Sequence, residues 1–293
     1  MPSTTIRQLS VALVATSILI ATQSSADAHG APRAKPVPAH HLAAIGASGA
    51  DEVWALGYQT HAQTGTIARH WDGTRWKAVQ TPDIARDHIN DVAVIAPDNA
   101  WAVGQKASAE GGQQVVNLVL HWDGAAWTEV PVPGLPGGHA SLDRVSAISA
   151  DDVIASGTSC EPCRNQSLHW DGMAWSQVKS GPLTSIAEVD AATPTDAWGV
   201  GQTAPYDGVA TARRWDGRRW RPVALPQQPY GGRMSAVADV AANDAWMSGK
   251  AWTEGHAGSI PWLLHWDGTT LVQTDPPFDS AAERLSGSGT DDV

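Results

Sequence analysis

The residues best suited to chemistry in this chain of 293 residues are its two cysteines, Cys160 and Cys163, in the sequence Cys-Glu-Pro-Cys. In an oxidising compartment, two cysteines at this spacing form a local disulfide. A C-x-x-C redox motif would need a βαβ context, and a zinc site would need two further ligands nearby. The surrounding sequence supplies neither, so it favours a disulfide, with redox and zinc chemistry as the alternatives.

A second set of candidate ligands recurs immediately before the tripeptide Trp-Asp-Gly. It comprises His70, His121, His169 and His265, and Arg214 takes the same place in a fifth copy. The arginine argues against a repeated metal site, and the repetition itself favours a buried hydrogen-bonding group. We expect each aspartate of Trp-Asp-Gly to cap its own turn. The sequence therefore predicts no metal and no cofactor.

Aromatic rings that lie outside the repeated positions are the candidates for ligand binding. They are Tyr58, Tyr206, Tyr230, Trp252 and Trp262. Flat rings in loops can stack on sugars or grip a peptide. The alternative is that they hold long loops in place.

The elements that must position these residues are set by a repeat. Trp-Asp-Gly begins at residues 71, 122, 170, 215 and 266, a period of 45 to 51 residues. Each copy has an apolar segment, a turn, a segment such as Asp-Glu-Val-Trp-Ala-Leu-Gly (51–57), a strand that runs into Trp-Asp-Gly, and a strand after it. Asp-Gly is a hairpin signal.

Four short antiparallel strands per period predict an all-β fold, a β-propeller of four-stranded blades. Thirteen of the fifteen tryptophans fall in three columns of the repeat, where we expect them to pack between blades. The repeats are 40–86, 87–138, 139–184, 185–231 and 232–280, and a sixth begins at 281–293. We expect the chain to be part of a longer propeller, with closure by five blades as the alternative.

The pattern resembles the tryptophan-rich propeller repeats of secreted bacterial proteins and is similar in kind to kelch, galactose-oxidase-like and Asp-box propellers. It departs from the Asp-box, because Asp and Gly are adjacent, and from kelch, because a single glycine such as Gly57 closes the second strand. The resemblance covers residues 40–293 and implies a fold, not an activity.

Insertions in the repeat favour one face of the propeller. The loop between the second and third strands varies in length, as does the connection from the fourth strand to the next repeat, whereas both hairpin turns are constant. In a four-stranded meander the two variable connections emerge at the same end. Variable loops on a rigid scaffold are where binding usually occurs.

The N-terminus and the charge indicate where the protein acts. Residues 1–28 have Arg7, an apolar stretch too short to span a bilayer, and Ala26-Asp27-Ala28, the pattern of a cleaved secretory signal. Residues 29–39 form a Pro- and Ala-rich linker. A net charge of −11 argues against nucleic acid and anionic membranes as partners.

The sequence thus favours a secreted, non-catalytic binding scaffold for an extracellular glycan or protein, with no membrane span after signal removal. Two alternatives stay open. One is a carbohydrate-active enzyme, either a sialidase-like hydrolase or an oxidase, for which Arg164, Glu110, Glu161 and Glu254 are available but form no legible catalytic set. The other is a purely structural surface module.

Overall fold

The fold was analysed in a computed structural model of the chain. It describes residues 40–59, 65–84, 87–109, 114–133, 139–160, 164–178, 185–203, 208–228, 230–277, 279–282 and 285–287. The predicted signal and linker, residues 1–39, therefore lie outside the described residues. Within the described ranges, no helix has the length and apolar character needed to cross a membrane.

The described residues form twenty strands in five consecutive groups of four, which we call units 1 to 5. Unit 1 contains β1 (His40–Gly49), β2 (Glu52–Gln59), β3 (Thr66–Trp71) and β4 (Trp76–Val79). Unit 2 contains β5 (His88–Ala96), β6 (Asn99–Ala107), β7 (Val115–Trp122) and β8 (Trp127–Glu129). Unit 3 contains β9 (His139–Ser149), β10 (Asp152–Cys160), β11 (Arg164–Trp170) and β12 (Trp175–Val178).

The last two units follow the same plan. Unit 4 contains β13 (Ser185–Thr193), β14 (Asp196–Gln202), β15 (Ala210–Trp215) and β16 (Trp220–Val223). Unit 5 contains β17 (Gly232–Ala241), β18 (Asp244–Trp252), β19 (Ser259–Trp266) and β20 (Leu271–Thr274), with the short 3-10 helix η1 (Glu254–His256) between β18 and β19. The predicted all-β architecture of four-stranded antiparallel sheets is confirmed.

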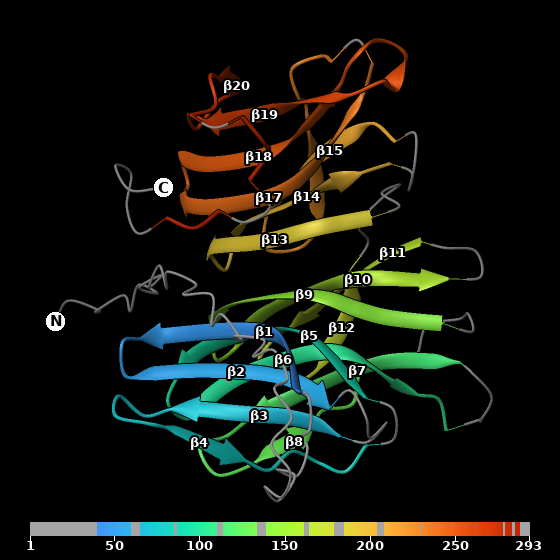
Figure 1. The fold of residues 1–293 in the computed structure, drawn as a ribbon. Coiled ribbons are helices and arrows are strands. Elements are labelled where there is room, and N and C mark those ends of the chain that lie inside the picture. The colour runs from blue at the N-terminus through green and yellow to red at the C-terminus, as the bar shows by residue number, and fades with distance from the viewer. Residues whose placement is uncertain are drawn as a thin grey trace, which may run out of the picture.

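Each unit is an antiparallel meander whose first strand is innermost (Figure 1). Units 1, 4 and 5 are separate four-stranded sheets. Units 2 and 3 join into one eight-stranded sheet through a single parallel pairing, Val115 with His139. The first strands β1, β5, β9, β13 and β17 therefore lie toward the middle, and the fourth strands lie at the outside.

The Trp-Asp-Gly turns form as the sequence predicts. Asp72 Oδ1 accepts hydrogen bonds from the backbone amides of Thr74 and Arg75, at 3.0 and 2.9 Å. Asp123, Asp171, Asp216 and Asp267 do the same in the other units. The glycine that follows each aspartate has a positive φ, 82° at Gly73, which explains why glycine is required there.

Tryptophans join neighbouring units. The second-strand tryptophan of one unit packs on the third-strand tryptophan of the next, and three such contacts are described. Their ring-centroid distances are 4.8 Å for Trp54–Trp122, 5.1 Å for Trp101–Trp170 and 5.2 Å for Trp198–Trp266. Between units 3 and 4 the second-strand residue is Ile154, which lies in a smaller core cluster with Trp215 and Trp220.

Candidate functional site

The repeated histidines are structural. His70 bonds Glu52 at 2.7 Å, His169 bonds Asp152 at 2.9 Å and His265 bonds Asp244 at 2.8 Å. His121 bonds Asn99, and Arg214 forms a bidentate ion pair with Asp196. Each partner begins the second strand of the same unit, so this column serves packing within a unit. In the described ranges, no three His, Cys, Asp or Glu side chains are grouped to hold a metal ion.

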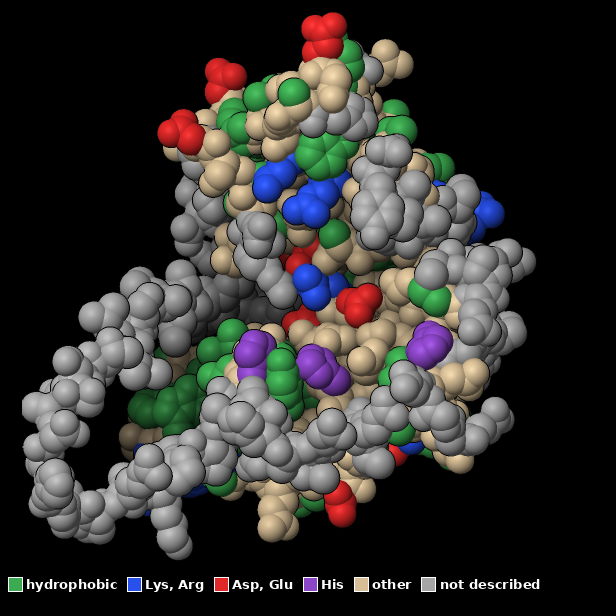
Figure 2. All heavy atoms as spheres, turned by 45° about the vertical axis from the view of Figure 1, so that its right-hand side comes forward, with side chains coloured by type: hydrophobic (Ala, Val, Ile, Leu, Met, Phe, Trp, Pro, Cys, Tyr) green, Lys and Arg blue, Asp and Glu red, His purple; other side chains and the backbone are tan. Residues whose placement is uncertain are grey.

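The strand ends that flank the variable connections lie on one side of the molecule, which we call the variable face (Figure 1). A depression of about 570 Å³ opens there, lined mainly by residues of the first strands of the five units. Its polar lining comes from every unit: His41, Asn90, Asp143, Arg144, Gln202, Arg233 and Ser235. Figure 2 brings this side forward and shows basic, acidic and histidine side chains gathered near the middle. We call this depression the mouth.

One hydrogen-bond network in the mouth links units 2 and 3. Asn90 Nδ2 donates to Leu142 O at 2.8 Å and to Ser141 Oγ at 3.0 Å. Ser141 Oγ donates to Asp143 Oδ1 at 3.1 Å. Burial raises the pKa of Asp143, while its Ser141 hydrogen bond opposes that rise. The network fixes these side chains in place.

Two arginines line the mouth. Arg144 Nε donates to Glu188 Oε2 at 3.1 Å, an ion pair that crosses from unit 3 to unit 4. Arg233 of unit 5 has a buried Nε–H without an acceptor. Buried donors are nearly always paired, so water or a ligand is the expected partner of this group.

Tyr58, one of the predicted ligand-binding aromatics, lies beside the mouth. Its ring stacks on His41 with a centroid distance of 4.8 Å and contacts the His88 ring of unit 2 at 4.5 Å. Burial is the main cause that lowers the pKa of His88, and the neighbouring His41 adds to it. The three rings form a ladder across units 1 and 2 on the variable face.

The other predicted aromatics are not brought together with Tyr58. Tyr230 is exposed at the end of repeat 185–231, and the backbone amide of Trp252 in unit 5 donates to Gly231 O next to it, so the two residues lie near each other. Trp262 is 2% exposed and packs in the core between units 4 and 5. Tyr206 lies outside the described residues. A shared aromatic surface made by all five residues therefore stays a prediction.

The remaining candidates for chemistry fall at the edges of the described ranges. Cys160 ends β10, and Cys163 lies outside the described residues, so the disulfide stays a prediction. Glu110 and Glu161 also lie outside them, as does the side chain of Arg164. Glu254 is exposed on η1.

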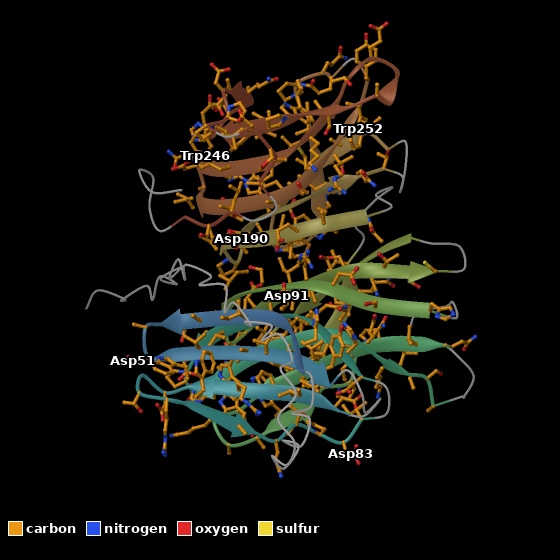
Figure 3. All side chains as sticks on the ribbon, viewed as in Figure 1. Asp51, Asp83, Asp91, Asp190, Trp246 and Trp252 are labelled. Carbon is orange, nitrogen blue, oxygen red and sulfur yellow. The ribbon has the colours of Figure 1, made fainter. Side chains whose placement is uncertain are left out.

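The first strands also line a second cavity, of about 480 Å³, which we call the channel and to which residues 285–287 contribute. Asp91 and Asp190 lie near the centre of the molecule (Figure 3). Asp91 accepts the backbone amide of Val145 at 3.1 Å. Asp190 accepts the amide of Asp239 at 2.9 Å, and Asp239 accepts that of Ala192 at 3.0 Å.

These carboxylates hold neighbouring units together. Burial raises the pKa of both Asp190 and Asp239. For Asp239 the nearby Asp196 and Asp190 carboxylates add to the effect and bring the pKa to about 9. This raised pKa favours the protonated form of Asp239 at neutral pH, because its ionised form is desolvated and close to two other carboxylates.

No protein-family profile and no curated protein sequence matches the chain. Solved structures do match. YCF48 bound to the D1 peptide is 14% identical with a TM-score of 0.51, covering 80% of this chain and 66% of YCF48. A GH74 xyloglucanase from Xanthomonas campestris is 15% identical with a TM-score of 0.53, covering 80% of this chain and 38% of the enzyme. The six-bladed fucose-binding lectin of Aleuria aurantia is 12% identical with a TM-score of 0.51, covering 80% and 78%.

At these identities the likeness concerns the fold alone. The three neighbours are β-propellers, so the chain has a propeller fold, as the repeat predicts. It spans about two thirds of YCF48 and well under half of the xyloglucanase. The three neighbours bind a peptide, act on a polysaccharide and recognise fucose, so the fold does not select a ligand class.

Proposed function

We propose that this protein is a secreted, non-catalytic binding propeller that holds an extracellular glycan or a protein segment over the mouth of its central channel. The observation that carries the proposal is the mouth itself, where all five units contribute polar side chains to one depression. The unpaired Nε–H of Arg233 and the ladder of His41, Tyr58 and His88 offer a donor and flat rings at its edge. The binding of a peptide by YCF48 and of fucose by the lectin supports either ligand class.

Binding is tested by screening the purified protein on glycan and peptide arrays, with titration of each hit. We expect Arg233→Ala and Tyr58→Ala each to lower the affinity for a ligand found on the arrays at least about tenfold, because each removes a direct contact. Arg218→Ala is the matched control, since Arg218 is exposed on a Trp-Asp-Gly hairpin at the opposite face. Equal affinity in all three variants would rule out the mouth as the binding site.

Secretion belongs to the same proposal. Residues 1–28 act as a cleaved signal, and 29–39 link it to the propeller domain at 40–293. N-terminal sequencing of the exported protein should begin at His29. Recovery of an uncleaved N-terminus in the exported protein would contradict the signal assignment.

The flank of unit 1 shows a second feature. Leu42 and Ile45 on β1 are 60% and 57% exposed. Their counterparts in the other units are buried: Ile89, Val92, Leu142, Val145, Ile186, Val189, Met234 and Val237. Trp76 is 45% exposed, whereas Trp127 at the same position of unit 2 is 3% exposed. This flank thus has the apolar character of a junction between units.

We therefore propose that a further four-stranded unit of the same repeat, beginning within residues 281–293, covers this flank between units 5 and 1. The channel supports it, because Leu285, at the position of Ile45 in the repeat, lines the channel with Gly46 of unit 1 and Val237 of unit 5. Without that unit, the exposed apolar flank promotes self-association.

Light scattering of the 29–293 chain tests this proposal. We expect concentration-dependent association that Leu42→Ser and Ile45→Ser reduce, with Val272→Ser, exposed on the outer strand β20, as the control. A wild-type chain that stays monomeric at all concentrations would contradict the further unit.

A further inference from the structure

The junction between units 3 and 4 holds buried polar atoms that have no hydrogen-bond partner. They are Ser156 Oγ, Asn165 Nδ2, Asn165 Oδ1, Thr211 Oγ1 and Arg213 Nε. Buried polar groups in native proteins are nearly always paired with protein, water or ligand. Their concentration in one junction therefore calls for a specific partner.

The strand register places these side chains opposite one another. Ile154 of unit 3 packs in one core cluster with Trp215 and Trp220 of unit 4. Since side chains alternate along a strand, Ser156 shares the Ile154 face of β10, and Arg213 and Thr211 share the Trp215 face of β15.

A hydrogen bond shows which face of β11 is directed at unit 4. Trp220 Nε1 donates to Ser167 Oγ at 3.0 Å, so that face of β11 is directed at unit 4. Asn165 lies two residues from Ser167 on the same strand and therefore shares its face. Ser156 is opposite Ser167 in the register of β10 and β11. The junction thus presents one arginine surrounded by hydroxyl and amide groups.

The charge of Arg213 is uncompensated. Its residue is 8% exposed, and among the described residues it forms no ion pair. Burial is the cause that lowers the pKa of its guanidinium, which shows that desolvation opposes the charge. Water can hydrogen-bond to a buried guanidinium, but it does not neutralise it. A carboxylate does both, through charge-assisted hydrogen bonds.

We propose that the junction between units 3 and 4 binds an acidic sugar, with the carboxylate of a uronic acid paired to Arg213 and its hydroxyl groups bonded to Ser156, Asn165 and Thr211. One cation matches one negative charge, which favours a carboxylate over a phosphate dianion. The neutral groups offer both donors and acceptors, as sugar hydroxyls require. Ser156 is 0% exposed and closes the inner end, whereas Asn165 and Thr211 are half-buried and lie toward the variable face.

This site is separate from the mouth and does not rest on the function proposed there. Asn165 and Thr211 lie on third strands, whereas the mouth is lined mainly by first strands. Arg233→Ala should therefore leave uronate binding unchanged. The two proposals can thus fail independently.

Thermal unfolding with added sodium galacturonate tests the proposal, with galactose, sodium acetate and sodium phosphate at equal concentration and ionic strength. At about ten times its Kd, galacturonate should raise the Tm by roughly 3–6 °C, and the other three solutes should have much smaller effects. Arg213→Gln should lower the affinity for galacturonate at least about tenfold. Arg218→Gln, on an exposed hairpin, should not change it.

Ser156→Val is the second variant, because it retains Arg213 and fills the inner end of the junction. It should weaken galacturonate binding several-fold in a chain that still unfolds cooperatively. No response of the wild-type protein to galacturonate, or an equal response in Arg213→Gln, would overturn the proposal. Equal effects of galacturonate and acetate would also overturn it, because they would indicate an adventitious anion only. Binding of a peptide carboxylate without binding of galacturonate would overturn it as well.

Discussion

The junctions on the two sides of unit 3 are built from the same positions but with opposite chemistry. Between units 2 and 3, Leu168 packs with Val103 and Val119 in one core cluster. At the same places between units 3 and 4 are Arg213, Ser156 and Ser167. Where Asn117 and Gln166 exchange hydrogen bonds of 2.7 and 2.8 Å in the first junction, Asn165 and Thr211 have unpaired polar atoms in the second.

This comparison shows how a repeat separates stability from function. The tryptophans, the turn aspartates and the paired histidines recur in nearly every unit: the tryptophans join neighbouring units, and the aspartates and histidines stabilise each unit. The position two residues before Trp-Asp-Gly is apolar in three of the four junctions and cationic in the fourth, so packing does not require a cation there. Leucine stands at this position in units 2, 3 and 5, as Leu120, Leu168 and Leu264, and arginine stands there in unit 1 as Arg69 and in unit 4 as Arg213. Among the four junctions between units, Arg213 is the exception, and it is therefore the residue to test for binding.

The strongest test of the comparison transfers the arginine into the apolar junction. Leu168→Arg buries a cation among Val103 and Val119 with no partner, and we expect it to lower the free energy of unfolding by about 3–5 kcal/mol. Urea denaturation measures the change, and Leu168→Met, which conserves volume, is the control with an expected loss below about 1.5 kcal/mol. A loss below 1 kcal/mol for Leu168→Arg would mean that the junction between units 2 and 3 is not tightly packed.

The junction between units 4 and 5 tests how a buried carboxyl group makes the stability of the protein depend on pH. Asp239 keeps its proton up to a pKa of about 9, whereas an unfolded aspartate loses its proton near pH 4. Between those values the folded state binds more protons, so its stability is full below pH 4 and falls as the pH rises toward 9. The slope is at most about 1.4 kcal/mol per pH unit for one group.

Asp239→Asn should remove this slope while retaining the acceptor for the Ala192 amide. Relative to the parent, the variant should gain thermal stability steadily from pH 5 to pH 8. Asp83→Asn is the matched control on an exposed loop. Parallel pH profiles for the parent and Asp239→Asn would show that the carboxyl group at this junction is ionised in both states.

Much of this fold could be predicted from the sequence, because the same four-strand pattern occurs in five successive repeats. Asp-Gly at Asp72 and Gly73 fixes a hairpin by local hydrogen bonds, and the constant spacing to the next tryptophan places the flanking strands. The role of the repeated histidines also followed, since an arginine at position 214 excludes a shared metal site. These features depend on residues close together in the chain.

The candidate sites depend on contacts between units, about fifty residues apart, and were harder to predict. Tyr58 was identified as a candidate, but its partners His41 and His88 were not, because neither belongs to a loop with a sequence signal. Arg213 was overlooked because it stands next to Arg214 in an apparently basic strand. Comparison of its column with Leu120, Leu168 and Leu264 would have identified it together with Arg69 of unit 1, since a charged residue at an apolar position is a signal that periodicity alone does not report.

The smallest expected effect separates the two asparagines that occupy one position in units 2 and 3. Asn117 Nδ2 donates to Gln166 Oε1, and Gln166 Nε2 donates back to Asn117 Oδ1, in a pair that is fully buried. Asn117→Ala leaves Gln166 Oε1 without that donor, whereas Gln166 Nε2 keeps its bonds to Ser141 O and Thr158 O. We therefore expect a loss of about 1–3 kcal/mol for Asn117→Ala.

Asn165→Ala provides the comparison, because the amide atoms of Asn165 have no partners to lose. Without a ligand its effect on the free energy of unfolding should be below about 0.5 kcal/mol, since removing an unsatisfied polar group offsets the lost packing. In saturating galacturonate the same substitution should become destabilising, because it then removes a contact to the sugar. Equal effects of Asn117→Ala and Asn165→Ala in the absence of ligand would mean that the junctions on the two sides of unit 3 do not differ energetically. A ligand-independent effect of Asn165→Ala would remove the asparagine from the sugar site and leave Arg213 to be tested alone.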